Sequence, residues 1–130
     1  MGLDMYLYGR KDNYHLVDYN IGRIGVQVEL GYWRKVNCVH QWFVDNVQDG
    51  VDNCATYYVS RETLEELKDV CQKVLDNPDR AEELLPNKEG FFFGSQEYDE
   101  WYFNDIQETI DIINKALKLD YDYYEYHSSW

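Results

Sequence analysis

Cysteine and histidine are scarce in this sequence, and their spacing argues against metal and redox sites. The three cysteines, Cys38, Cys54 and Cys71, are odd in number and lack C-x-x-C spacing. Neither a disulfide framework nor a thiolate zinc site is therefore expected. The three histidines show no paired spacing that would suit a transition metal. We accordingly expect neither a metal nor a cofactor.

Long apolar runs and basic charge are also lacking. No segment approaches 18 uninterrupted apolar residues, so we expect no membrane partner. The opening MGLDMYLYGR lacks the basic start and continuous apolar run of a signal peptide, which leads us to expect a location in the cytoplasm. With 25 acidic against 12 basic residues, the net charge of −13 would repel a long nucleic acid. A small anion could still bind in a local basic pocket.

Aromatic and aliphatic residues are abundant enough to form a core. The chain is 45% hydrophobic and 17% aromatic, with 13 Tyr and 4 Trp, unlike the composition of a disordered segment. A length of 130 residues suits one domain, and no linker or repeat divides the chain. We expect residues 1–130 to form a single domain.

Hydrophobic periodicity predicts the elements of the first half. Alternation predicts strands at residues 3–9 and 24–31, with a polar loop between them and Gly31 ending the second. Spacing typical of a helix then covers residues 32–47, with Gly50 suited to a C-terminal cap. The stretch ATYYVS predicts a short strand at residues 55–60.

The second half begins with a helix that Ser60 caps and that Asn77 and Pro78 end. A short helical turn over residues 80–86, a buried strand at 91–93 and a long helix from Ser95 to Lys118 follow. A last strand has a change of phase at Tyr123 and Tyr124 that predicts a bulge or a bend. Together the elements predict an α+β domain of two layers, with a mixed or antiparallel sheet packed against three main helices. Strand order is left open.

Two polar residues fall inside the apolar stripe of the first predicted helix. Asn37 and His40 share an arc of roughly 120° with five apolar residues, Trp33, Val36, Phe43, Val44 and Val47. A buried polar side chain costs about 1–3 kcal/mol unless its hydrogen bonds are satisfied. Asn37 and His40 therefore either bond within the core or lie on the floor of a pocket.

The pocket interpretation brings further candidates for ligand binding. Arg34 and Gln41 flank the stripe as donors, and Trp33 lies on the same face. Near the start of the last helix, Ser95 is a cap and three aromatic residues are available for stacking, namely Tyr98, Trp101 and Tyr102. A planar guanidinium, hydrogen-bonding edges and aromatic rings suit recognition of a nucleotide.

Catalytic arrangements find little support. Cys38 lies about 160° around the predicted helix from His40, so the two cannot form a dyad. The terminal His127, Ser128 and Ser129 have no nucleophile elbow. We expect a protein that is not an enzyme.

Four motifs carry a resemblance that spans nearly the whole chain. MGLDMYLY, YWRKVNCVHQWFV, GFFFGSQEYDEWYF and the closing SSW resemble a family of small proteins found in bacteriophages and prophages. Arg34, Lys35, Asn37, His40 and Trp42 match that family's helical motif. The resemblance implies a phage setting but no particular reaction.

In a phage setting, three functions remain open. The first is a sponge that sequesters a nucleotide immune signal, such as a cyclic oligonucleotide or an ADP-ribose derivative. The second is an acidic decoy that imitates nucleic acid and occupies a host defence protein. The third is an enzyme that degrades the nucleotide. Arg34, His40 and the aromatic residues favour the sponge, and a homodimer in which Trp42 is a contact could close its pocket.

Overall fold

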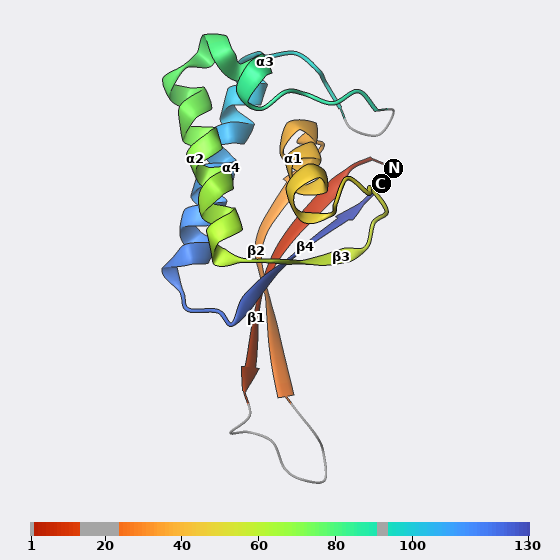
Figure 1. The fold of residues 1–130 in the computed structure, drawn as a ribbon, viewed down its shortest axis with the longest axis vertical. Helices are drawn as coiled ribbons and strands as arrows, with labels where there is room; N and C mark the ends of the chain where they lie inside the picture. The colour runs from red at the N-terminus through yellow and green to blue at the C-terminus, as the bar shows by residue number, and fades with distance from the viewer. Residues whose placement is uncertain (1, 14–23, 91–93) are drawn as a thin grey trace.

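Four antiparallel strands form one sheet that packs against helices, so the expected α+β class is confirmed (Figure 1). The computed structural model describes residues 2–13, 24–90 and 94–130. In chain order the elements are β1 (Asp4–Asn13), β2 (Ile24–Arg34), α1 (Asn37–Val47), β3 (Thr56–Val59), α2 (Arg61–Asp76), η2 (Pro78–Arg80), α3 (Ala81–Leu84), α4 (Glu100–Lys118) and β4 (Tyr123–Ser129). The strand predicted at 91–93 and the loop predicted around 18–22 lie outside the described residues.

The sheet has the strand order β2-β1-β4-β3, in which the two ends of the chain are neighbours. Alternation in β1 directs Met5 and Leu7 into the core beneath the helices, and Leu3, just before the strand, is buried with them. The far half of the β1–β2 hairpin projects beyond the helices as a two-stranded arm (Figure 1). No helix of the described residues is both long and apolar enough to cross a membrane.

Strand β2 is longer than its sequence predicts. It continues through Gly31 to Arg34, so the helix predicted from Tyr32 begins only at Asn37. The register shifts between Leu7 and Tyr8, which leaves Leu30 as an extra residue in β2. Gly31 continues the strand because α4 packs on it: an added Cβ would lie 2.3 Å from Ile112 Cγ2. Close packing against α4, and not the end of the strand, explains why a glycine occupies position 31.

The later elements confirm some predicted boundaries and correct others. Ser60 caps α2, accepting a hydrogen bond from the backbone N–H of Thr63 at 3.1 Å. The last helix, however, is capped by Asp99 and begins at Glu100, so Ser95 is not its cap. The bulge expected near Tyr124 is also absent, because β4 pairs with both neighbours in continuous register.

Candidate functional site

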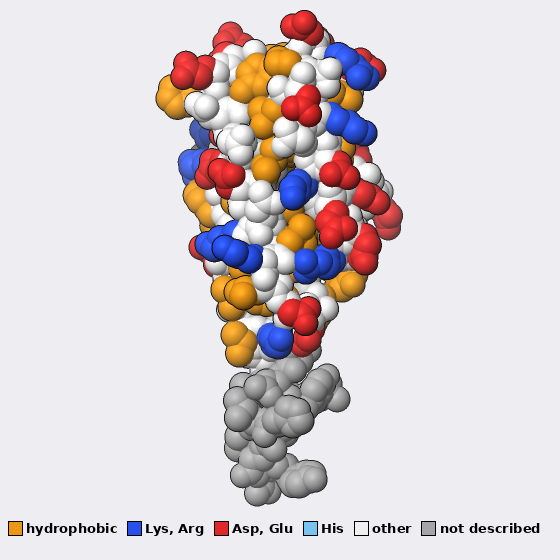
Figure 2. All heavy atoms as spheres, turned by 90° about the vertical axis from the view of Figure 1, so that its left-hand side faces the viewer, with side chains coloured by type: hydrophobic (Ala, Val, Ile, Leu, Met, Phe, Trp, Pro, Cys, Tyr) orange, Lys and Arg blue, Asp and Glu red, His pale blue; other side chains and the backbone are white. Residues whose placement is uncertain are grey.

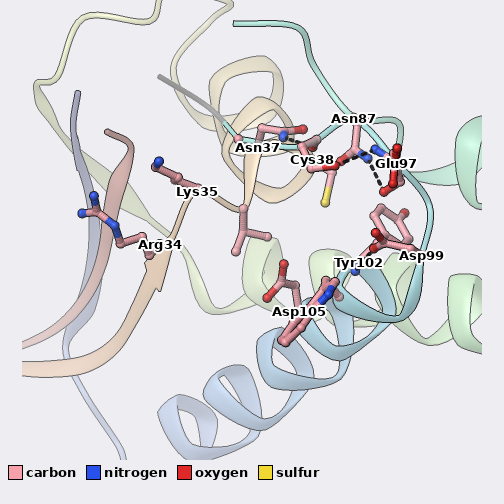
Figure 3. A pocket seen from close by; sticks show the side chains of 13 residues that line it. Arg34, Lys35, Asn37, Cys38, Asn87, Glu97, Asp99, Tyr102 and Asp105 are labelled. Atoms are coloured by element: carbon pink, nitrogen blue, oxygen red, sulfur yellow. Dashed lines mark hydrogen bonds between the residues drawn. The ribbon is translucent and has the colours of Figure 1, made fainter. Parts of the chain in front are cut away.

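A cavity of about 290 Å³ lies where the turn from β2 into α1 meets the segment before α4 (Figure 3). Residues 34–38 line one side, and Gly94 and Ser95 close it from the segment that precedes α4. The first turns of α4 supply Trp101, Tyr102 and Asp105. The cavity brings together five of the nine residues predicted to bind a ligand: Arg34, Asn37, Ser95, Trp101 and Tyr102.

Asn37 connects α1 to the segment that walls the cavity. Its side-chain amide donates to the Ser95 carbonyl at 2.8 Å, and its side-chain oxygen accepts from the Lys88 backbone N–H at 2.8 Å. Asn87 adds a bond from its own amide to the Glu97 carbonyl at 3.2 Å. Because residues 85–90 and 94–99 of this segment lie in no helix or strand, these side-chain bonds hold their backbone in place.

Tyr98 and Tyr102 form hydrogen bonds to the backbone of the same cavity wall. The Tyr98 hydroxyl accepts from the Asn87 backbone N–H at 2.9 Å, and the buried Tyr102 hydroxyl donates to the Leu85 carbonyl at 2.7 Å. The two rings meet edge to face with centroids 5.0 Å apart. Tyr98 therefore acts in positioning the wall, while Tyr102 also lines the cavity.

Carboxylates gather at the α4 end of the cavity. Asp105 projects from α4 toward the start of α1, and the Cys38 thiol points into the same space from α1 (Figure 3). Burial, with smaller contributions from the nearby Glu108 and Asp99, raises the pKa of Asp105 to about 6. Burial likewise raises the pKa of Cys38, so the thiol stays protonated at neutral pH.

The cations lie at the opposite rim. The Arg34 side chain runs away from Asp105 toward β1 (Figure 3), where its Nη1 donates to Asp4 Oδ1 at 2.7 Å. Lys35 follows in a left-handed conformation with φ of 56° and forms no ion pair within the described part of the chain. The cavity is thus bipolar, with carboxylates at one end and a lysine at the other.

His40 lies in the core, away from this cavity. Its side chain is 0% exposed, with Nδ1 2.6 Å from the Tyr126 hydroxyl and Nε2 3.0 Å from Asp52 Oδ1. Asp52 also accepts from the indole N–H of Trp130 at 3.0 Å. Burial lowers the pKa of His40 although Asp52 opposes the shift. His40 thus ties α1 to the last strand and the chain end.

Two other predicted residues also lie apart from the cavity. Trp33 belongs to β2, and its buried indole N–H donates to Thr109 Oγ1 on α4 at 2.9 Å. Gln41 lies beside a separate hollow and donates to Asp45 on its own helix. Trp42, the expected dimer contact, is partly buried against the core.

Sequence reasoning missed Lys35 and Asp105, which define the two ends of the cavity. Asp105 follows Trp101 by four residues and Tyr102 by three, so a helix places the three on one face. That spacing is the signal in the sequence that could have identified Asp105 as a site residue. Among the described residues, no group of three His, Cys, Asp or Glu side chains is placed to hold a metal ion.

Comparisons with family models, curated proteins and solved structures found no match to this chain.

Asp105 should make stability depend on pH. A carboxyl with a raised pKa in the folded state stabilises the fold below its ordinary pKa and loses that contribution as pH rises through about 6. Asp105→Asn, which keeps the shape without the charge, should be more stable than the wild type at about pH 7.5 and equal to it at about pH 4. Urea unfolding at both values measures this. Equal stability of the two proteins at both values would contradict the assignment.

Proposed function

We propose that the protein binds one small nucleotide-like molecule in this cavity without chemical change and thereby withholds it. The observation that carries the proposal is Trp101, a large aromatic side chain left 76% exposed at the rim of a formed cavity. An exposed ring beside hydrogen-bonding side chains offers a base a surface on which to stack.

The two ends of the cavity suit the two ends of a nucleotide. The amino group of a base stacked on Trp101 can donate a hydrogen bond to the Asp105 carboxylate, while an anionic group lies toward the ammonium of Lys35. Arg34 is less available, because Asp4 already pairs with its guanidinium. The proposed contacts therefore shift the anion-binding role from Arg34, where the sequence predicts it, to Lys35.

Size narrows the choice of ligand. A volume of about 290 Å³ is at the lower limit of ligand pockets, which suits one nucleotide unit better than a ring of several. Among the expected signals, this favours a mononucleotide or part of an ADP-ribose derivative over a whole cyclic oligonucleotide. In the phage setting implied by the sequence resemblance, such binding would remove an immune signal from the host.

Binding without catalysis is supported by the state of the only thiol that lines the described cavity. Cys38 is 2% exposed and protonated, so it is a poor nucleophile. His40, which could act as a base, is held by Tyr126 and Asp52 in the core. The proposal therefore assigns these groups no chemical step.

Trp101→Ala should weaken binding by about tenfold, the loss of a stacking contact worth about 1–3 kcal/mol. Because the ring is exposed, the melting temperature should change little. Isothermal titration with AMP, ADP-ribose and cyclic di-AMP measures the affinities, and Trp101→Phe is the matched control that keeps a ring. Unchanged affinity in Trp101→Ala would refute stacking at this residue.

The net charge of −13 favours a second candidate, an acidic decoy that binds a host defence protein. Incubation of the purified protein with the same three nucleotides, followed by repurification and release by heat, separates the candidates. A sponge returns an intact nucleotide, an enzyme returns a product, and a decoy returns nothing. Recovery of a product or of nothing would overturn the proposal.

A further inference from the structure

The sheet face opposite the helices is covered by tyrosines. Alternation that buries Leu3, Met5 and Leu7 places the intervening residues of β1 on this face, and the same holds for the other strands. We call this surface the tyrosine face; its aromatic members are Tyr6, Tyr8, Tyr32, Tyr58 and Tyr123. Tyr32 is 41% exposed and Tyr58 is 65% exposed.

The rings of the tyrosine face lie close to one another, both along β1 and across neighbouring strands. The Tyr6 ring contacts Tyr8, Tyr32 and His127, with centroid distances of 6.0, 5.3 and 6.1 Å. Tyr58 and Tyr123 lie 5.8 Å apart. Tyrosine is enriched in protein interfaces because it offers a large apolar ring with a polar tip and few rotatable bonds.

Charge is nearly balanced on the described part of this face. Among the side chains that the structure describes on this face, the charged ones are Arg10, Arg34, Asp4, Glu29 and Glu125, so two positive charges against three negative charges leave −1. Arg34 pairs with Asp4 at 2.7 Å, and Arg10 approaches Glu125 at 3.5 Å. Two tyrosine faces therefore repel each other only weakly. On the side of the molecule formed by α2, acidic and basic side chains are interspersed (Figure 2).

The register of the strands makes the tyrosine face complementary to itself. Asp4 and Arg10 lie on β1 at equal distances from Leu7, and His127 and Glu125 of β4 pair with the two residues on either side of Leu7. A twofold axis that crosses the strands at Leu7 would set Asp4 of one copy over Arg10 of the other. It would also set Glu125 over His127, and each contact would occur twice.

We propose that two copies of this chain associate through their tyrosine faces about such an axis. Stacked sheets lie about 10 Å apart, a distance that tyrosine side chains from both sides fill. The dimer places opposite charges over one another at its ends and aromatic rings at its centre. The inference is independent of the ligand proposed for the cavity.

Sedimentation velocity on the full chain tests the proposal. The wild type should sediment as a dimer of about 31 kDa, twice the chain mass of 15.6 kDa. Arg10→Glu and Asp4→Lys should each weaken the dimer by about tenfold to a hundredfold, because each sets like charges opposite one another twice. An equal mixture of the two variants should restore the dimer, since both contacts are then attractive. Arg80→Glu makes the same charge change on η2, away from the face, and should leave the dimer intact.

Circular dichroism of each variant verifies folding before the comparison. The proposal is overturned by a wild type that remains at the mass of one chain at every concentration. It is also overturned if either charge reversal leaves the dimer unchanged, or if mixing the two folded variants fails to restore association.

Discussion

His40→Ala is expected to lower the free energy of unfolding by about 3–5 kcal/mol. The substitution empties a site that is 0% exposed and removes the hydrogen-bond partner of the buried Tyr126 hydroxyl. It also removes the bond from His40 to Asp52, the residue that accepts from the indole N–H of Trp130. Urea denaturation followed by tryptophan fluorescence measures the loss.

Two further measurements test the assignment of His40. Tyr126→Phe removes only one hydroxyl and should cost less, about 1–2 kcal/mol. Because burial lowers the pKa of His40, its contribution should be present above about pH 6.5 and lost as pH falls, a trend opposite to that of Asp105. A cost below 1 kcal/mol for His40→Ala, or no change in the slope of stability against pH, would contradict the account.

Asn37→Ala is expected to cost about 2–3 kcal/mol and to abolish measurable ligand binding. The change leaves the Ser95 carbonyl and the Lys88 N–H without the side chain that joins them to α1. The wall of the cavity should then loosen, which hydrogen exchange of the backbone amides at residues 87–90 and 94–97 would detect.

Gln41→Ala is the matched control for Asn37→Ala. It removes an amide from the same helix, but that amide bonds only to the exposed Asp45 one turn away among the contacts described. Its cost should stay below about 0.5 kcal/mol, with exchange and ligand affinity unchanged. If the two variants behave alike, Asn37 does not hold the wall.

The sequence predicts elements well where local signals decide them. Ser60 caps α2, and the spacing of this helix predicts an apolar stripe of Leu64, Leu67, Val70, Cys71 and Val74, of which all but the partly buried Val70 are buried. The sequence predicts helices and strands poorly where packing between distant segments decides their boundaries. Gly31 looks like the end of a strand, yet β2 continues because Ile112 of α4 occupies the space that a side chain would take.

The same limit applies to the candidate site. The sequence identifies Asn37 and His40 as buried polar groups, and both are buried. Their different surroundings come from chain segments that meet only in the fold: Ser95 and Lys88 reach Asn37, whereas Tyr126 and Asp52 reach His40. The prediction that Trp33 lies in the first helix is wrong, because residues 31–33 fit a strand as well as a helix.

The most direct test of ligand binding is mass spectrometry of small molecules that copurify with the protein from a bacterial lysate. The account predicts that the wild type carries a nucleotide, released intact by heat, at a level that Trp101→Ala and Asn37→Ala each reduce. Absence of any nucleotide from the folded wild type, or equal recovery from all three proteins, would contradict it.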